Sequence, residues 1–198
     1  NRERKSFVYI ATVEPHLPYR PSQEHLSREW PLPQPFPSAA TARLSQEIER
    51  GRRVLSGEEK SYVRALYDSS VADVGDAFGM ALQEIEEIGM SQDLAIILVG
   101  DHGEELFERG ALGHGGSLKQ ESLEIPMAFR VPQRPALTVR KEASSVDLYA
   151  SVLDLAGQKV EDLGESESVF RPQRLRGMHP RLSGLPDGSR SIRMGHMK

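Results

Sequence analysis

The run LAIILV at residues 94–99 constrains the fold more than any other feature of the chain. Six consecutive apolar residues stand between Asp93 and Gly100. A short apolar run without polar alternation is typical of a strand that is buried on both faces, as in a parallel sheet covered by helices on both sides. The run therefore predicts a central parallel strand in an α/β domain.

Two further runs of β-branched, aromatic and other apolar residues predict strands. They are FVYIATV at residues 7–13 and IPMAFRV at residues 125–131. Pro126 cannot donate a hydrogen bond to a sheet, so it marks the second run as an edge strand or as the start of a strand. The segment from Pro18 to Pro37 is rich in Pro, Ser and charged residues, which predicts a long surface excursion of the kind that often covers a site.

Helical periodicity is clearest after Ser56. Ser56 and Glu59 have the spacing of a capping box, and apolar residues then repeat at helical intervals as far as Gly89. A second helix is predicted at residues 146–156, with one of the two serines just before it as its N-cap. The alternation of strands and helices predicts an α/β fold. Residues 165–198 lack sustained periodicity, and we expect a loosely ordered basic tail there or the start of a further subdomain.

Charge and composition exclude several classes of function. The chain has 25 Lys and Arg against 29 Asp and Glu, a formal net charge of -4. General affinity for nucleic acid is not expected, because that affinity rests on basic surfaces. No apolar run reaches the roughly 18 residues that a membrane-spanning helix needs. The chain has no cysteine, so any metal must be held by oxygen and imidazole nitrogen.

Candidate site residues follow the central strand directly. Asp101 and His102 come after LAIILVG, and ligands of open α/β sheets gather at the carboxyl ends of the strands. A carboxylate and a neutral imidazole suit Zn, Mn, Mg or Ca, depending on the remaining ligands. The alternative is that Asp101 caps the following turn and that His102 is a half-buried loop histidine.

Two more histidines follow or border predicted strands. His114 lies between glycines in GHGG, where the backbone can approach a ligand closely, and His16 comes just after the strand predicted at residues 7–13. Each of them alone is a common kind of loop residue. Together with His102, they predict a cluster of imidazoles at one end of the sheet.

Five segments of the chain occur in an order that resembles the sulfatase family of the alkaline-phosphatase superfamily. They are EPHLPY, YDSSVADVGDAFG, GDHGEELFERGALGHGG, ESLEIPMAFRVP and SSVDLYASVLDLAG, within about residues 7–160. The resemblance implies a three-layer α/β sandwich with a mainly parallel central sheet, alkaline-phosphatase-like and incomplete at the amino end. Residues 1–164 would then be the carboxyl-terminal portion of the catalytic domain.

The same resemblance implies roles for four residues. Asp101 and His102 match the family's metal pair after the central strand. His16 matches the histidine that contacts the charged ester group or stabilises the leaving oxygen. His114 matches the position where members place a Lys or His against the sulfate or phosphate. His16 and His114 are therefore predicted to be catalytic and substrate-binding, and Asp101 and His102 to be metal ligands.

The chain departs from the family pattern in what it lacks. Members carry a nucleophile near the amino end of the domain, which is a formylglycine made from Cys or Ser, or a Thr or Ser, together with two further metal carboxylates. None of these is recognised in this chain. Because the chain starts at Asn1 rather than Met, we expect it to be a piece of a longer protein. Because a metal site with only Asp101 and His102 is half built, we expect this piece to be inactive alone.

His102 stands where calcium-dependent sulfatases commonly have Asn. The resemblance implies Ca or Mg for a true sulfatase, and Mn or Zn for the Asp-His type of phosphoethanolamine and glycerophosphate transferases and phosphodiesterases. An imidazole ligand favours a transition metal over Ca. Glu104 and Glu105 are candidates for orienting His102 from behind, and the alternative is that they are exposed loop glutamates.

The leading prediction is metal-dependent hydrolysis of a small-molecule sulfate ester by the longer protein. A phosphodiesterase or transferase of the same superfamily, acting on a phosphate ester, is one alternative, and a non-catalytic relative that binds anions or a partner protein is another. A receiver-like or flavodoxin-like domain fits the histidine-bearing loop poorly. The resemblance also implies a periplasmic or other extracytoplasmic location, with the longer protein free or tethered to a membrane.

Overall fold

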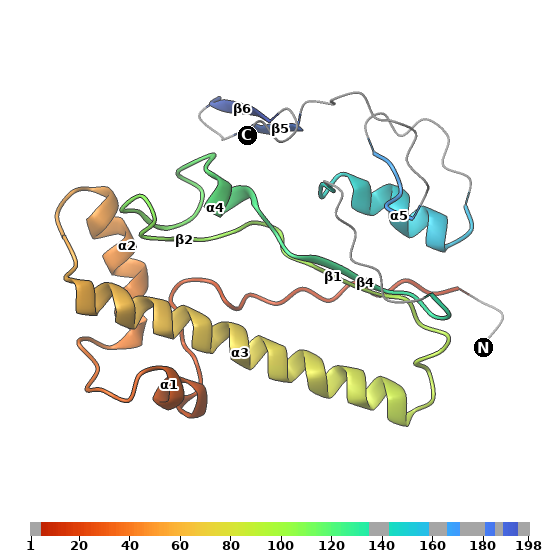
Figure 1. Ribbon diagram of the computed structural model, residues 1–198, viewed down its shortest axis with the longest axis horizontal. Helices are drawn as coiled ribbons and strands as arrows, with labels where there is room; N and C mark the ends of the chain where they lie inside the picture. The colour runs from red at the N-terminus through yellow and green to blue at the C-terminus, as the bar shows by residue number, and fades with distance from the viewer. Residues whose placement is uncertain (1–4, 135–142, 159–165, 171–180, 185–187, 194–198) are drawn as a thin grey trace. The chain divides into compact units, whose positions relative to one another are not determined.

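The computed structural model describes residues 5–134, 143–158, 166–170, 181–184 and 188–193. Its elements, most of them labelled in Figure 1, are α1 (Gln23–Glu29), the 3-10 helix η1 (Ser38–Ala40), α2 (Thr41–Glu49), α3 (Gly57–Glu87), β1 (Ile96–Val99), β2 (Glu105–Leu106), β3 (Leu112–Gly113), α4 (Gln120–Leu123), β4 (Met127–Arg130), α5 (Asp147–Leu155), β5 (Arg181–Gly184) and β6 (Arg190–Arg193). The chain divides into two compact units. The first comprises Asn1–Tyr9, Leu94–Asp101 and Pro126–Lys198, and the second comprises Ile10–Asp93 and His102–Ile125.

Helix α3 is the longest element of the second unit and confirms the predicted helix. Glu59 N–H donates to Ser56 Oγ at 3.1 Å, and Ser56 N–H donates to the Glu59 carboxylate at 2.8 Å. This capping box satisfies amide groups that have no partner within the helix. Beyond the other end, Gly89 has a φ of 71°, a left-handed conformation that glycine adopts without strain, and the helix stops there.

The hydrophobic core of the second unit lies along the amino-terminal half of α3. The buried residues of this helix fall between Tyr62 and Ser70, whereas Met80 and Ile88, towards and beyond its other end, are 68% and 65% exposed. The core cluster consists of Tyr19, Leu26, Leu44, Leu55, Tyr62, Val63, Leu66, Phe107 and Leu112. The helix is therefore held by packing at one end.

The excursion at residues 18–37 lies largely at the surface, as predicted, but it is partly packed and contains a helix that the sequence did not predict. It contains helix α1, whose Leu26 is buried in the core. Trp30 and Phe36 lie against Tyr62 of α3, with ring-centroid distances of 5.3 and 5.2 Å. The large apolar area of these aromatic rings outweighs the polar composition of the segment. Helix α2, which follows, has no counterpart among the predicted helices.

In the first unit, β1 confirms that the run LAIILV forms a strand, and β4 confirms the strand predicted after it. The two strands pair antiparallel, with Ile96 opposite Arg130 and Val99 opposite Met127. Pro126 precedes β4, as predicted for the start of a strand. Because the chain turns back after β1 without a crossover, the neighbour of β1 is antiparallel, and the described residues give β1 no parallel neighbour.

The strand predicted at residues 7–13 does not form. Its large apolar side chains are between 72% and 80% exposed, namely Phe7, Val8, Tyr9, Ile10 and Val13. A strand requires hydrogen bonds to a neighbouring strand, and within the described ranges no such neighbour pairs with this segment. A sequence that favours β structure therefore stays irregular here, and it presents an apolar surface of the kind that marks a contact site.

Helix α5 confirms the helix predicted at residues 146–156, but the predicted serine cap is wrong. The N-cap is Val146, which makes no side-chain cap bond. Instead the Asp147 carboxylate accepts a hydrogen bond from Ser144 N–H at 3.0 Å, which ties the first turn of the helix to the segment just before it. Gly157 closes the helix with a φ of 70°.

The described residues beyond 165 form ordered contacts that the sequence did not predict. Ser168 Oγ donates to the Asp154 carboxylate at 2.7 Å, and Val169 N–H donates to Ser151 Oγ at 3.0 Å, so this segment lies against α5. Strands β5 and β6 pair antiparallel. Such a ribbon is held by backbone hydrogen bonds, which leave no signal in apolar periodicity.

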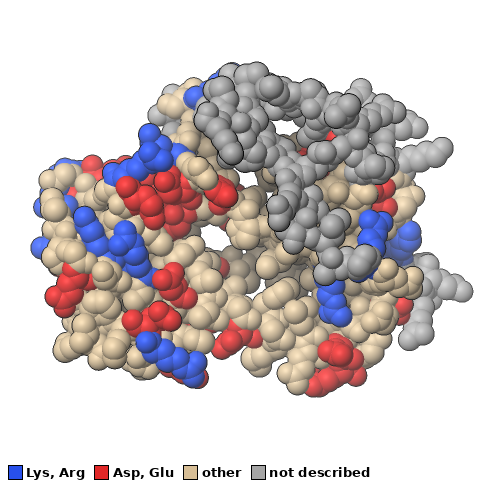
Figure 2. Space-filling model, viewed as in Figure 1, with Lys and Arg blue, Asp and Glu red and all other residues tan. Residues whose placement is uncertain are grey.

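Acidic and basic side chains are intermixed on the described surface that Figure 2 presents. On the described part of this face, the mixing leaves no continuous positive surface of the kind that holds a nucleic-acid backbone. Within the described part of the chain, no helix combines the length and apolar character that a membrane span requires.

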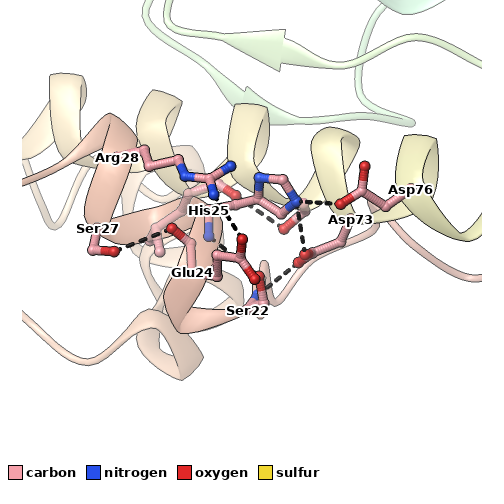
Figure 3. A network of polar contacts seen from close by, with 9 residues as sticks. Ser22, Glu24, His25, Ser27, Arg28, Asp73 and Asp76 are labelled. Atoms are coloured by element: carbon pink, nitrogen blue, oxygen red, sulfur yellow. Dashed lines mark hydrogen bonds and ion pairs between the residues drawn. The ribbon is translucent and has the colours of Figure 1, made fainter.

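A polar network connects helix α1 to α3 (Figure 3). His25 Nε2 lies 2.9 Å from Asp76 Oδ2 and 3.7 Å from Asp73 Oδ1. Ser22 N–H donates to Asp73 Oδ2 at 2.6 Å. Burial acts to raise the pKa of Asp73, but the hydrogen bonds from Ser22 and the charge of His25 outweigh it and hold that pKa below its ordinary value.

We expect Asp73→Asn to loosen α1, because the amide keeps the size of the side chain and loses its charge. Amide hydrogen exchange of residues 23–29 at pH 6 should quicken about fivefold, which corresponds to roughly 1 kcal/mol. Because the pKa of Asp73 is lower in the folded chain than in the unfolded chain, its carboxylate stabilises the fold fully at pH values above the unfolded pKa of about 4. This stabilisation is lost as the pH falls through the folded-state pKa. The variant and the wild type should therefore converge as the pH falls below the folded-state pKa of Asp73.

The control for this experiment is Glu84→Gln, an exposed carboxylate further along α3. It should leave exchange of residues 23–29 unchanged. Equal exchange in the wild type and Asp73→Asn, or equal quickening in the control, would contradict a role of the network in holding α1.

Candidate functional site

A short hairpin in the second unit folds the loop that follows β1. Strands β2 and β3 pair antiparallel, with Glu105 opposite Gly113. Paired residues of adjacent strands lie about 5 Å apart, so the residue before β2 is brought beside the residue after β3. The register therefore places Glu104 next to His114.

Three imidazoles, those of His16, His102 and His114, gather at this hairpin. The rings of His102 and His114 stack with centroids 3.8 Å apart and planes inclined by 30°. The ring of His16 meets His114 edge-on, with centroids 5.0 Å apart. The sequence predicted that these histidines would converge, and the structure brings them together. Their catalytic and binding roles stay predictions.

Each of the three rings uses Nδ1 for a hydrogen bond to a protein oxygen. His16 and His102 each pair Nδ1 with the carbonyl oxygen of the next residue, at 2.5 and 2.9 Å. His114 pairs Nδ1 with Glu104 Oε1 at 3.0 Å. Carbonyl and carboxylate oxygens accept, so Nδ1 carries the proton in each ring. Nε2 is then the acceptor of each neutral ring, and it becomes a second donor when the ring is protonated.

Glu104 is the buried partner of His114. Its side chain is 6% exposed and that of His114 is 23% exposed. Gly113, next to His114, has a φ of 101°. A Cβ at Gly113 would stand 3.2 Å from both the Leu17 and Ser45 side chains. The backbone conformation and the close packing therefore both require glycine at this position.

Tyr19, from the segment EPHLPY, lies on the core side of Glu104. Its side chain is fully buried, and its ring meets that of Tyr67 at a centroid distance of 5.4 Å. Burial, followed by the charge of Glu104, raises the pKa of Tyr19 above its ordinary value. The phenol is consequently neutral at ordinary pH. Sequence reasoning did not single out Tyr19, although it stands only three residues after His16.

Glu105 ties the hairpin to the region of α4. Ser117 Oγ donates to Glu105 Oε1 at 2.5 Å, and Ser122 Oγ donates to the same oxygen at 3.3 Å. Glu105 is 4% exposed. Both loop glutamates are thus largely buried, which rules out the alternative that they are exposed. The histidine that Glu104 contacts through its hydrogen bond is His114, whereas the sequence suggested His102.

Phe107 anchors the hairpin to α3. Its side chain is 8% exposed and belongs to the core cluster. The cations of Lys60 and Arg64 lie 5.8 and 5.7 Å from the centre of its ring, and Arg64 also donates to the Leu106 carbonyl at 2.8 Å. Phe107 has a φ of 74°, which a bulky residue rarely adopts and which costs about 1–3 kcal/mol. Burial of the ring offsets this strain.

Gly103 lets the loop pass close to α4. Its N–H donates to the Ser122 carbonyl at 2.9 Å. A Cβ at this position would lie 2.0 Å from the Glu121 carbonyl oxygen and 2.9 Å from that of Glu124. No side chain fits without a backbone shift, and this contact fixes the backbone directly after His102.

We expect Gly103→Ala to displace the loop, because the added methyl group overlaps a main-chain carbonyl. The free energy of unfolding should fall by about 2–3 kcal/mol, and any hydrolytic activity of the full-length protein should fall at least tenfold. Urea denaturation and a steady-state assay measure the two effects. Gly116→Ala is a matched control, because a Cβ there meets nothing within 4 Å. If Gly103→Ala changed neither the free energy of unfolding nor the activity, the close contact with α4 would be contradicted.

The predicted metal ligands Asp101 and His102 are both exposed. Among the residues that the structure describes, no three His, Cys, Asp or Glu side chains are grouped to hold a metal ion. The stacking of His102 on His114 gives a reason, since the nitrogen lone pairs of stacked rings do not point at one common position. The donor chemistry nevertheless fits a divalent ion, because His102 keeps its proton on Nδ1 and so leaves Nε2 as a ligand atom, and the residue before it in the sequence, Asp101, carries a carboxylate.

Comparison with known proteins agrees with the resemblance seen in the sequence. A sequence model of the family described as Sulfatase matches residues 1–158. The endo-4-O-sulfatase of Bacteroides thetaiotaomicron is 27% identical over 152 residues, which cover 76% of this chain and 28% of that protein. The chain spans between 24% and 36% of the curated relatives that it matches.

Solved structures share the fold. The phosphonate monoester hydrolase SpPMH from Silicibacter pomeroyi has a TM-score of 0.61 at 22% identity, over 84% of this chain and 33% of that one. BT4656 in complex with its substrate D-glucosamine-2-N,6-O-disulfate has a TM-score of 0.54 at 20% identity, over 79% of this chain and 34% of that one. The predicted alkaline-phosphatase-like α/β fold is thereby confirmed, and this chain forms part of it.

Proposed function

Because the chain belongs to the sulfatase family, a family of hydrolases, we propose that the full-length protein hydrolyses a sulfate ester and that this chain supplies one side of the anion site. The observation that carries the proposal is the cluster of His16, His102 and His114. All three rings are held at Nδ1. Fixed imidazoles of this kind can bind an anion and move a proton.

His114 is proposed to bind the ester anion. When its ring is doubly protonated, Nδ1–H stays on Glu104 and Nε2–H donates to a sulfate oxygen. A hydrogen bond between two charged groups is roughly twice as strong as a neutral one. Because the ring is oriented before substrate arrives, this donor can stabilise the charge that develops on the sulfuryl oxygens with little reorganisation.

His16 is proposed to donate the proton to the leaving group. As the nucleophile bonds to sulfur, the bond between sulfur and the alcohol oxygen breaks and its electron pair remains on that oxygen, which takes the proton from Nε2 of the doubly protonated His16 ring. The hydrogen bond from Nδ1 to the Leu17 carbonyl holds the ring during the transfer. The neutral ring then recovers a proton from water. Its contact with His114 supports action on one and the same anion.

Asp101 and His102 are proposed as ligands of a divalent ion. Such an ion supplies neutralisation of the anion's charge and activation of the nucleophile. A carboxylate with an imidazole favours Mn or Zn, whereas resemblance to true sulfatases implies Ca or Mg. The nucleophile, a formylglycine or a hydroxyl group, is proposed to come from outside this chain.

A second candidate activity is hydrolysis or transfer of a phosphate ester by the same site. The Asp-His pair at residues 101 and 102 favours it, because this pair is the feature in which the chain departs from calcium-dependent sulfatases. A tetrahedral phosphate anion can use the same imidazole donors. A non-catalytic relative that binds anions or a partner protein is supported less well, because three pre-oriented imidazoles are more than simple surface binding requires.

A small sulfated sugar is the proposed substrate class. Its support is that one relative is named an endo-4-O-sulfatase and that BT4656 takes a glucosamine disulfate as its substrate. An extracytoplasmic location of the full-length protein, free or tethered to a membrane, stays a prediction from the family resemblance.

We expect His102→Ala to abolish turnover of an aryl sulfate by the full-length protein, since a metal ligand is removed. His114→Ala should lower kcat/KM by about 100- to 1000-fold, as the loss of a fixed anion donor does. His25→Asn is the control. The side chain of His25 is buried to a degree similar to that of His114 but lies in the contact between α1 and α3, so its loss should change kcat/KM less than threefold. Wild-type activity in His102→Ala would show the metal assignment to be wrong.

Removal of metal by a chelator should also abolish turnover. Adding back Mn, Zn, Ca or Mg separately then tests the ligand chemistry, and Mn or Zn should restore more activity than Ca if Nε2 of His102 binds the ion. Metal content before and after dialysis is measured by elemental analysis. Full activity in a metal-free sample would contradict the proposal.

A further inference from the structure

The hydrogen bond between Glu104 and His114 has no part in the resemblance to the family, and its geometry assigns a function to Glu104. We infer that Glu104 is a positioning residue, which fixes the tautomer and the ring orientation of His114 so that Nε2 faces the ester anion. This inference rests on the proposed function of His114 and adds to it the residue that prepares that histidine.

The first support is the geometry of the pair. Glu104 Oε1 lies 3.0 Å from His114 Nδ1, at normal hydrogen-bond distance. The glutamate side chain is 6% exposed, and the histidine side chain is 23% exposed. The carboxylate is therefore shielded from water and holds the Nδ1 side of the imidazole, while the Nε2 side of the ring stays accessible to solvent and ligand.

The second support is that the surroundings restrict Glu104 itself. The pairing of Glu105 with Gly113 fixes the backbone on both sides of the contact. The position of a Cβ on Gly113 is 3.9 Å from Glu104 Oε1, so the carboxylate lies within van der Waals contact of that position. Tyr19, whose pKa the charge of Glu104 helps to raise, borders it towards the core. A carboxylate held in this way cannot follow a rotating ring.

The third support is that His114 has another neighbour that does not set its tautomer. Its ring stacks on His102 with centroids 3.8 Å apart. Stacking restrains the plane of the ring but leaves it free to turn over by 180° about the Cβ–Cγ bond. That turn puts Cδ2 in the place of Nδ1 and Cε1 in the place of Nε2. The hydrogen bond to Glu104 removes that freedom, because one of the two orientations satisfies the buried carboxylate and the other leaves it without this donor.

Nuclear magnetic resonance of the full-length protein labelled with 15N-histidine tests the inference directly. The ring nitrogen shifts report which nitrogen carries the proton, and His114→Gln identifies the signals of His114. Glu104→Met keeps the volume of the side chain and removes the acceptor, whereas Glu104→Gln retains an oxygen that can accept from Nδ1. We expect the Nδ1–H signature of His114 to persist in Glu104→Gln and to be lost in Glu104→Met.

Kinetics provide a second readout. Glu104→Met should lower kcat/KM for an aryl sulfate by about 10- to 100-fold, the usual effect of removing such a partner, and Glu104→Gln should recover most of this loss. Glu105→Gln is the matched control, because this neighbouring buried carboxylate accepts from Ser117 and Ser122. It should leave the His114 signals unchanged.

An unchanged Nδ1–H signature in Glu104→Met would overturn the inference, whatever the activity of that variant. If Glu104→Met does not fold, Glu104→Ala takes its place with the same expectation. A wild-type protein that turns over no sulfate ester would overturn the proposed function, yet the ring signals would still decide whether Glu104 fixes His114. The two failures are therefore distinguishable.

Discussion

Burial of the Phe107 ring against the amino-terminal half of α3 is the contact on which the candidate site depends. The turn between β2 and β3 needs a left-handed residue, and Phe107 fills that position despite the strain. The apolar contacts of the ring and the two cations beside it stabilise the turn. Since β2 and β3 are only two residues each, backbone pairing alone could not hold them. Without this anchor, the strands that bring Glu104 to His114 would have no fixed register.

Local patterns explain which parts could be predicted from the sequence. The capping box at Ser56, the apolar run that contains β1 and the position of histidines after predicted strands all depend on near neighbours in the chain. The convergence of His16, His102 and His114 was predicted from those strand ends. The structure brings the rings together, although the strand at residues 7–13, which was expected to precede His16, does not form.

Features that depend on distant contacts could not be predicted in the same way. The bond between Glu104 and His114 joins residues that meet only through the register of a two-residue hairpin. The excursion at residues 18–37 reads as a loop because its composition is polar, and only the presence of Tyr62 explains why Trp30 and Phe36 are packed. Conversely, residues 7–13 favour β structure, but a strand depends on a neighbour that local sequence does not supply.

The hairpin also separates what is fixed from what can vary. Its base carries the histidine contacts and is buried, whereas Glu108, Arg109 and Gly110 at its tip are exposed. Insertions at an exposed tip are tolerated when the flanking backbone is held elsewhere. Evolution can therefore lengthen this tip to contact larger or differently branched substrates, while the imidazoles at the base keep their orientation. Such an arrangement allows related proteins to diversify specificity without rebuilding the anion site.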